Sequence, residues 1–292
     1  MGRALIQQGL EPTMACPDGI PGYFDYLPGA DLVVSQPPAS FDLIITLDSS
    51  DLGRLGGFAS VVETASVPVL NVDHHVTNTV FGDVNLVDSM AASTAEVVLR
   101  LLEALDASLD STIARCLMTG LVTDTRGFRT NNVTPQTMEA ALRLMRAGAS
   151  LPEIAHHALD RRSIAAMRLW GAALSEELQL KNRVIWSTIP RAMRRAVGYP
   201  GEGDAQLASF LSGAIEADVS VVFIEQAEGD VDVSLRADPG FDVAEVAIQF
   251  GGGGHALAAG CQLGGPLEEA RERFLNVLWA ELERQRGESG SN

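Results

Sequence analysis

The first two-fifths of the chain alternates short apolar runs with runs of helical periodicity. Residues 42–47 (DLIITL) and 67–72 (VPVLNV) are continuous β-rich runs, and each is followed at once by an aspartate, Asp48 and Asp73. Apolar runs of this length without polar alternation are typical of parallel strands that are buried on both faces. Residues 57–65 predict a crossover helix between them, so the pattern predicts a parallel sheet covered by helices.

Two later helices have recognisable first turns. The sequence STAE at 93–96 is a capping box, and the amphipathic run 97–105 follows it. Thr134 and Pro135 open a further helix as its N-cap and its first helical position.

A second α/β unit follows a long helical segment. Three further β-rich runs define this unit: residues 184–189, 219–224 and 231–235. We therefore divide the chain into an N-terminal parallel-sheet domain (1–160), a connecting helix (161–182), a smaller α/β domain (183–286) and a polar tail expected to be disordered (287–292). The fold class is α/β, and we expect the functional site in a cleft between the two domains.

Charge and cysteine content narrow the classes of partner. The net charge of −17 comes from 21 basic and 38 acidic side chains. Proteins that grip long duplex nucleic acid carry basic surface, because neutralised phosphates supply most of that affinity. No apolar run approaches the roughly 18–20 residues of a membrane span. Cys16, Cys116 and Cys261 form no CxxC pair, which is typical of a reducing cytoplasm.

The strongest chemical signal is the triplet Asp73-His74-His75 directly after an apolar run. Asp48 ends the preceding run and Asp124 follows another, so we expect all three sites at the carboxyl ends of strands, where parallel sheets form their sites. Aspartate and histidine together suit Mn²⁺ or a similar divalent ion. The alternative is that the aspartates are turn residues and the histidines a solvated pair, but three such sites together favour a metal centre.

A second histidine pair, His156-His157, lies inside the helical run 151–159 with no acidic strand end nearby. We assign it a structural role.

Four successive glycines stand directly before His255: Gly251, Gly252, Gly253 and Gly254. Each costs roughly 0.5–1 kcal/mol more to order than alanine, so such a run persists where backbone approaches a ligand or takes positive φ. Its N–H groups can form an anion-binding nest, and a helix beginning in 256–259 would add its N-terminus. His255 would then donate to a phosphate. The alternative is a flexible loop with a surface histidine.

Two arginines are candidates for the same chemistry. Arg236 ends the run 231–235, and guanidinium geometry suits bidentate contact with phosphate. Arg129 follows Asp124 by five residues and could reach the metal pocket. Each is a surface charge in the alternative interpretation.

Five motifs together resemble the DHH phosphoesterase family, which takes its name from the Asp-His-His triplet. They are LDSSD (47–51), NVDHH (71–75), GLVTDTRGFR (120–129), SLR (234–236) and FGGGGH (250–255). The branch they resemble is that of the nanoRNases (oligoribonucleases) that also act as 3′-phosphoadenosine-5′-phosphate (pAp) phosphatases. The resemblance extends from about residue 10 to residue 285.

The resemblance implies two Mn²⁺ ions, with Mg²⁺ and Co²⁺ as alternatives. Asp48 would bridge the ions, and His74 and Asp124 would bind one of them. The catalytic set would include His75, in contact with the scissile phosphate, and Asp73. Arg236, the glycine run with His255, and Arg129 would hold the substrate. Substrates would be short oligoribonucleotides, cut to mononucleotides, or pAp, converted to AMP, and the family leads us to expect a homodimer.

Two competing functions stay open at this point. A RecJ-like single-strand exonuclease would want basic surface or stacking aromatics, whereas aromatic residues make up 5% of this chain. A non-catalytic nucleotide-binding protein would keep the glycine run but would have no need of His74 and Asp124.

The family's first motif, an Asp-x-Asp loop that supplies ligands to both ions, has no counterpart before Asp48. Residues 2–8 resemble the end of the helix that would follow that motif. We therefore predict that the 292-residue chain is inactive or nearly so, and that a version extended upstream in frame is active. The measurement is Mn²⁺-dependent phosphate release from pAp by both proteins, and full turnover by the shorter one would contradict the prediction.

Overall fold

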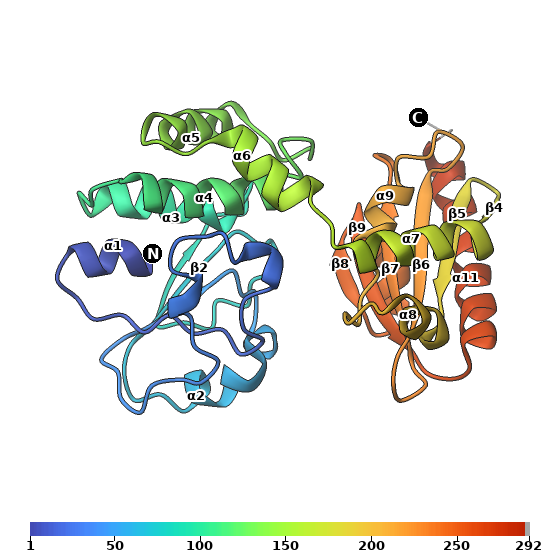
Figure 1. The fold of residues 1–292 in the computed structure, drawn as a ribbon, viewed down its shortest axis with the longest axis horizontal. Helices are drawn as coiled ribbons and strands as arrows, with labels where there is room; N and C mark the ends of the chain where they lie inside the picture. The colour runs from blue at the N-terminus through green and yellow to red at the C-terminus, as the bar shows by residue number, and fades with distance from the viewer. Residues whose placement is uncertain (290–292) are drawn as a thin grey trace. The chain divides into compact units, whose positions relative to one another are not determined.

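The computed structural model describes residues 1–289 and divides the chain into two compact units, Met1–Arg161 and Arg162–Asn292. Both units are α/β, as the sequence predicts (Figure 1). None of the helices within the described residues is long and apolar enough to cross a membrane.

The sheet of the first unit has three parallel strands in the order β1-β2-β3. They are β1 (Ile44–Leu47), β2 (Val69–Asp73) and β3 (Val84–Val87). The connection from β1 to β2 contains a 3-10 segment, η3 (Leu52–Phe58), and the short helix α2 (Ala59–Glu63). The crossover helix predicted at 57–65 is therefore present as α2, shorter than predicted, and the 3-10 segment precedes it.

Only one of the two predicted strands is buried as expected. Val69, Val72 and Asp73 on β2 are buried, whereas Leu47 on β1 is 41% exposed. The difference follows from position, because β2 lies between two strands and contacts helix α3 (Thr94–Ala104), while β1 pairs with β2 alone among the described strands.

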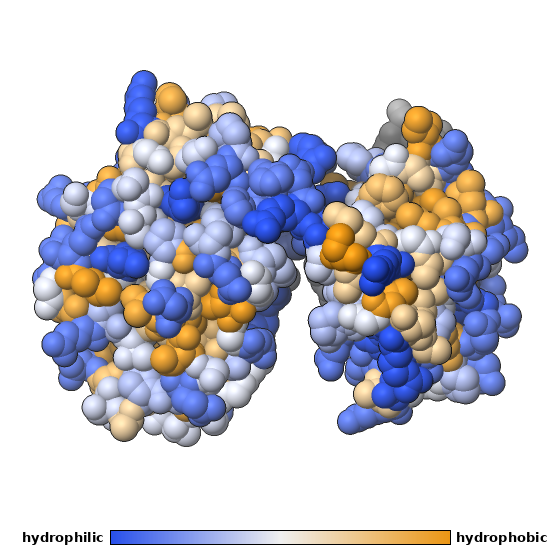
Figure 2. All heavy atoms as spheres, viewed as in Figure 1, coloured by the Kyte–Doolittle hydropathy of each residue, from blue (hydrophilic) through white to orange (hydrophobic). Residues whose placement is uncertain are grey.

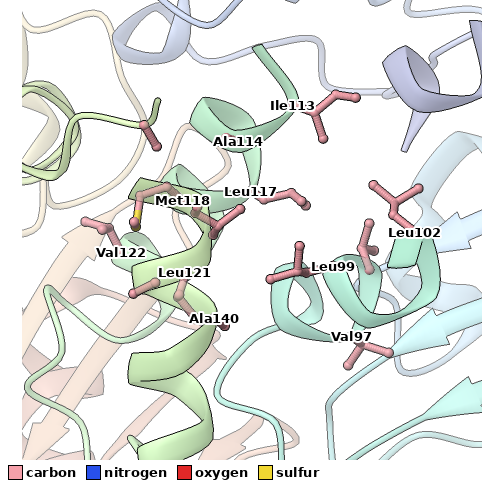
Figure 3. Packing of buried hydrophobic residues seen from close by; sticks show 14 of the residues in the cluster. Val97, Leu99, Leu102, Ile113, Ala114, Leu117, Met118, Leu121, Val122 and Ala140 are labelled. Atoms are coloured by element: carbon pink, nitrogen blue, oxygen red, sulfur yellow. The ribbon is translucent and has the colours of Figure 1, made fainter. Parts of the chain in front are cut away.

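The first unit contains further helices, several of which pack with β2 and α3 in its core. They are α1 (Gly2–Gln7), α4 (Ser111–Asp124), α5 (Pro135–Arg146), α6 (Leu151–Ala155) and the π-helix η4 (His156–Asp160), with 3-10 turns η1 (Gly22–Phe24) and η2 (Ala30–Leu32). Leu99, Leu117 and Leu121 on α3 and α4 point toward one another in Figure 3 and are buried. Burial of such side chains, at roughly 25 cal/mol per Å², is the main force that holds these helices together.

The caps of α3 and α5 lie where the sequence predicts them. The Ser93 hydroxyl accepts from the Glu96 N–H at 3.3 Å, and Thr134 caps α5. The capping box of α3 is only half formed, because the Glu96 carboxylate accepts from the N–H of Ala92 (3.1 Å) instead of that of Ser93.

The second unit is built on a six-stranded sheet with the order β4-β5-β6-β7-β9-β8, in which only β5 and β6 run parallel. The strands are β4 (Gln179–Lys181), β5 (Val184–Ile189), β6 (Val219–Glu225), β7 (Val231–Ala237), β8 (Gly253–His255) and β9 (Ala258–Leu263). One hydrophobic cluster joins the sheet to α10 (Ala244–Gln249) and α11 (Leu267–Ser289). Another joins it to α7 (Ile164–Glu176), α8 (Arg191–Val197) and α9 (Leu207–Leu211).

Three expectations for this unit differ from the structure. No helix begins at 256–259, because residues 258–263 form strand β9 and pair back onto β8. The segment predicted to connect the domains contains α7, which packs on β5 and α8 of the second unit. Disorder is predicted from residue 287, but α11 continues to Ser289, and residues 290–292 lie outside the described residues.

The stability of the second unit should depend strongly on Phe274. This side chain is fully buried and packs on Phe223 and Phe250, with ring centroids 5.8 and 5.0 Å away. Phe274→Ala should lower the free energy of unfolding by about 3–5 kcal/mol, measured by chemical denaturation.

The control is a hydrophobic residue at the surface. Figure 2 shows hydrophobic residues scattered among hydrophilic ones at the surface, and Ile215 is 90% exposed. Ile215→Ala, as the control, should change stability by less than about 0.5 kcal/mol. Equal effects of the two substitutions would contradict this account of the core.

Candidate active site

Two parallel strands carry Asp48 and Asp73 to the same edge of the first sheet. Leu47 pairs with Val72 in the register of β1 and β2, and the Asp48 N–H continues the ladder by donating to the Val72 carbonyl at 3.1 Å. Asp48 has φ of 61°, in the left-handed region, which turns the chain out of the strand at this residue. Such a conformation costs a non-glycine residue roughly 1–3 kcal/mol and persists where its surroundings require it.

His74 presents one ring nitrogen to two carboxylates. Its Nδ1 lies 3.3 Å from the Ala91 carbonyl oxygen, which can only accept, so the proton belongs on Nδ1 and the lone pair on Nε2. Nε2 lies 3.7 Å from Asp48 Oδ1 and 3.8 Å from Asp124 Oδ2. These separations fit a divalent ion held about 2.1 Å from each donor atom. One imidazole and two carboxylates form a donor set suited to Mn²⁺, Zn²⁺ or a similar ion.

Asp124 reaches this point from the end of a helix and not, as predicted, from the end of a strand. The apolar run before it forms α4, whose last residue is Asp124. A left-handed turn at Arg126, Gly127 and Phe128 then ends the helix, with the Gly127 N–H donating to the Val122 carbonyl at 2.8 Å. The prediction failed because an apolar run by itself does not distinguish a buried helix from a buried strand.

The electrostatics of this cluster favour a cation. Burial and the negative charge of Asp48 raise the pKa of Asp124 to about 6. The C-terminal end of α4 adds partial negative charge. A divalent ion between Asp48 and Asp124 would stabilise the ionised form of both carboxylates.

His75 is held by a buried carboxylate. Its Nδ1 lies 2.8 Å from Oδ1 of Asp73, whose side chain is 0% exposed. Burial alone would raise the pKa of Asp73, but hydrogen bonds from His75, from the Asn78 amide (2.6 Å) and from the His74 N–H (2.8 Å) outweigh it and hold that pKa below its usual range. The ligand atoms of Asp48, His74 and His75 lie within 4.8 Å of one another. What distinguishes His74 is that its Nε2 lies within 3.8 Å of the carboxylates of both Asp48 and Asp124.

Two polar side chains that sequence analysis did not single out complete the cluster. The Thr94 hydroxyl, at the first turn of α3, donates to Asp48 Oδ1 at 2.6 Å. Asn78, three residues after His75, donates to Asp73. The only sequence signals were the position of Thr94 in the capping box and the closeness of Asn78 to the triplet.

The structure does not join Arg129 to this cluster. The side chain is exposed, and its Nε donates to the Arg126 carbonyl at 2.7 Å, so it folds back on its own turn. His156 and His157 lie in η4, where His157 stacks on Tyr26 with 4.4 Å between ring centroids, in keeping with the structural role assigned to the pair.

The glycine run in the second unit forms one arm of the β8–β9 hairpin. A Cβ on Gly252 would lie 2.2 Å from the Gly260 carbonyl oxygen, and Gly251 and Gly254 have φ of 75° and 143°. These three positions need glycine for the hairpin itself. Gly253 differs, because a Cβ there would meet no atom within 4 Å.

Arg236 and His255 lie in one row across this sheet. Ala258 on β9 pairs with Arg236 on β7 and with His255 on β8. Residues directly opposite each other point to the same face, so Arg236 and His255 flank the Ala258 methyl group across two strand spacings, about 10 Å. Burial lowers the pKa of Arg236, and none of the salt bridges among the described residues includes it. A guanidinium in this position suits an anion.

Both units match known protein families. Residues 4–121 match the DHH family, N-terminal domain, and residues 196–284 match the DHHA1 domain. The chain is 32% identical over 274 residues to the bifunctional oligoribonuclease and PAP phosphatase NrnA of Thermus thermophilus, covering 90% of this chain and 79% of that protein. It is 24% identical over 246 residues to the protein of the same name from Bacillus subtilis, covering 79% and 78%.

A crystal structure of an exopolyphosphatase-related protein from Bacteroides fragilis shares the fold, with a TM-score of 0.88 at 22% identity over 97% of this chain and 87% of that one. The chain therefore belongs to the DHH family and is a hydrolase of the phosphoesterase type. Its similarity to proteins that combine oligoribonuclease and PAP phosphatase activities places it, within that family, among their relatives.

The metal assignment predicts that His74→Ala and Asp124→Asn each weaken the binding of Mn²⁺, measured by isothermal titration calorimetry. Each substitution removes one of three donors, so the loss should be at least the roughly 10–100-fold seen when only a partner of a metal ligand is removed. His156→Ala, in η4, is the matched control and should leave the affinity unchanged. Unchanged affinity in both site variants would mean that the cluster holds no metal.

Proposed function

We propose that this protein is a Mn²⁺-dependent phosphoesterase that cuts short oligoribonucleotides to mononucleotides and converts pAp to AMP. The observation that supports the proposal is that the Asp48 and Asp124 carboxylates both lie within 3.8 Å of His74 Nε2, with His75 Nδ1 3.9 Å from Asp48. The substrates are those named for the relative that is 32% identical.

Asp48, His74 and Asp124 would hold the metal. A bound divalent ion supplies positive charge to the phosphoryl group and lowers the pKa of the attacking water. Asp48 is the carboxylate best placed to serve a second ion, because its side chain is 51% exposed and only Oδ1 receives the Thr94 hydroxyl.

His75 would contact the phosphate at which cleavage occurs. The Asp73 carboxylate fixes the orientation of the ring through Nδ1. A histidine held in this way can donate to a phosphate oxygen or pass a proton to the leaving oxygen. Asp73, which is fully buried, would act through His75 and not touch the substrate.

The second unit would bind a phosphate that is not cleaved, through Arg236, His255 and the hairpin backbone around Gly253. A charged guanidinium without an acidic partner among the described salt bridges costs less when an anion lies beside it. Local positive groups of this kind let a chain with a net charge of −17 bind a small polyanion, while long nucleic acid is disfavoured.

The proposal predicts that Asp124→Ala lowers Mn²⁺-dependent phosphate release from pAp, and mononucleotide release from di- to pentanucleotides, by at least about a hundredfold. The assay is run on this chain and on the version extended upstream in frame. His156→Ala is the control and should keep full activity. Nucleotide binding with no turnover of either substrate by either protein would favour a non-catalytic nucleotide-binding protein.

Gly253→Ala separates a ligand-binding role of the glycine run from a structural one. The new methyl group meets no protein atom within 4 Å, so the unfolding midpoint should not change. If a phosphate lies against this backbone, the KM for pAp should rise about tenfold, or ~1.4 kcal/mol. Gly264→Ala, where a Cβ would lie 3.8 Å from Asp230 Oδ1, is the matched control with no expected effect. An unchanged KM in Gly253→Ala would show that the run only builds the hairpin.

A further inference from the structure

Asn78 makes four side-chain hydrogen bonds. Its Nδ2 donates to Asp73 Oδ2 at 2.6 Å and to the Ser49 carbonyl at 3.2 Å. Its Oδ1 accepts from the Val80 N–H at 2.7 Å and from the Asn71 amide at 3.2 Å. A carboxamide has two N–H donors and two acceptor lone pairs, so the hydrogen-bonding capacity of Asn78 is fully used.

These four bonds restrict the chemistry of this position. Aspartate would offer only acceptors and would place a second negative charge against Asp73, whose pKa is already held low by donated hydrogen bonds. Alanine would leave buried polar groups without partners, which costs about 1–3 kcal/mol for each. Among neutral side chains only glutamine has the same donors and acceptors, on a stem one methylene longer.

The bonds join the two loops that carry the active-site residues. Ser49 directly follows Asp48 in the loop after β1, and Asp73, the first residue of the triplet, is the last residue of β2, which leads into the loop of Asn78. Thr79 forms a second link between the same two loops, because its N–H and its hydroxyl donate to the Ser50 carbonyl at 2.7 and 3.2 Å. The separation between Asp48 and His75, now 3.9 Å between Oδ1 and Nδ1, is therefore set in part by Asn78.

The two oxygens of the Asp73 carboxylate accept hydrogen bonds from different donors, and Asn78 occupies one of them. Oδ2 receives the Asn78 amide, and Oδ1 receives His75 Nδ1 and the His74 N–H, each at 2.8 Å. This arrangement fixes the rotation of the carboxylate. It thereby holds the His75 ring with its proton on Nδ1.

We propose that Asn78 is a positioning residue of the phosphoesterase centre: it fixes the Asp73 carboxylate toward His75 and holds the loop of Asp48 at its distance from the triplet. This inference rests on the proposed function for its effect on turnover. Its structural part concerns the His75 ring alone and holds with or without catalysis.

The test compares Asn78→Asp and Asn78→Gln with Asn85→Ala. Asn85 is a matched control, because its amide closes only a local turn with the backbone of Gly82, donating at 2.6 Å and accepting at 3.1 Å. Nitrogen-15 NMR of the histidine rings reports the hydrogen-bonded Nδ1–H of His75, assigned with His75→Ala. Steady-state kinetics with Mn²⁺ and pAp, run on the version extended upstream in frame, report kcat and KM separately.

Asn78→Asp should abolish the downfield proton signal of the hydrogen-bonded His75 Nδ1–H. It should lower kcat about 10–100-fold and change KM less than about threefold. Asn78→Gln should recover part of the signal and part of kcat. Asn85→Ala should retain both, even if it lowers the unfolding midpoint as much. If Asn78→Asp does not fold, Asn78→Gln decides the question, because a shifted His75 signal in a folded protein supports the proposal.

An unchanged His75 ring signal in a folded Asn78 variant would overturn the positioning role while leaving the phosphoesterase function intact. The NMR measurement needs neither metal nor turnover. A shifted ring signal, together with no hydrolysis of pAp or oligonucleotides by the version extended upstream, would instead keep the positioning role and defeat the proposed function.

Discussion

The carboxylate of Asp73 has no exposed surface, and an ionised carboxylate buried without partners would cost several kcal/mol. Its negative charge persists because the His75 ring, the Asn78 amide and the His74 N–H all donate to it. Each donor must therefore stay in place, and together they determine the conformation of the Asp-His-His segment. The exposed half of the centre, Asp48 and the Nε2 side of His74, is organised around this buried half.

The two units carry opposite charges at the sites that we propose for the metal and for phosphate. The first unit gathers carboxylates at the edge of a parallel sheet, where burial and the charge of Asp48 raise the pKa of Asp124 to about 6 and favour a bound cation. The second unit would use the partly buried guanidinium of Arg236 and a glycine hairpin that admits no side chain at Gly252. A strongly acidic protein can in this way attract a small anion at particular points without attracting long nucleic acid.

Predictions from the sequence were correct where the signal is local and wrong where the structure depends on contacts with distant parts of the chain. The N-caps Ser93 and Thr134 were predictable because a short polar side chain bonds an N–H two or three residues away. The strand state of residues 258–263 was not, because it depends on pairing with β7 and β8. Arg129 was placed near the metal by its spacing from Asp124, but the turn between them reverses the chain.

The sequence alone indicated the α/β class, the DHH family and the residue types of the centre, because strand-forming runs and the Asp-His-His triplet are local features. Only the tertiary structure decided that Asp124 arrives on a helix, that Asp73 lies beneath His75, and that Asn78 and Thr94 complete the cluster. The physical reason is that hydrogen bonds and charge pairs act over about 3–4 Å in space, whatever the separation along the chain. Thr94 and Asp48 stand 46 residues apart and share one hydrogen bond.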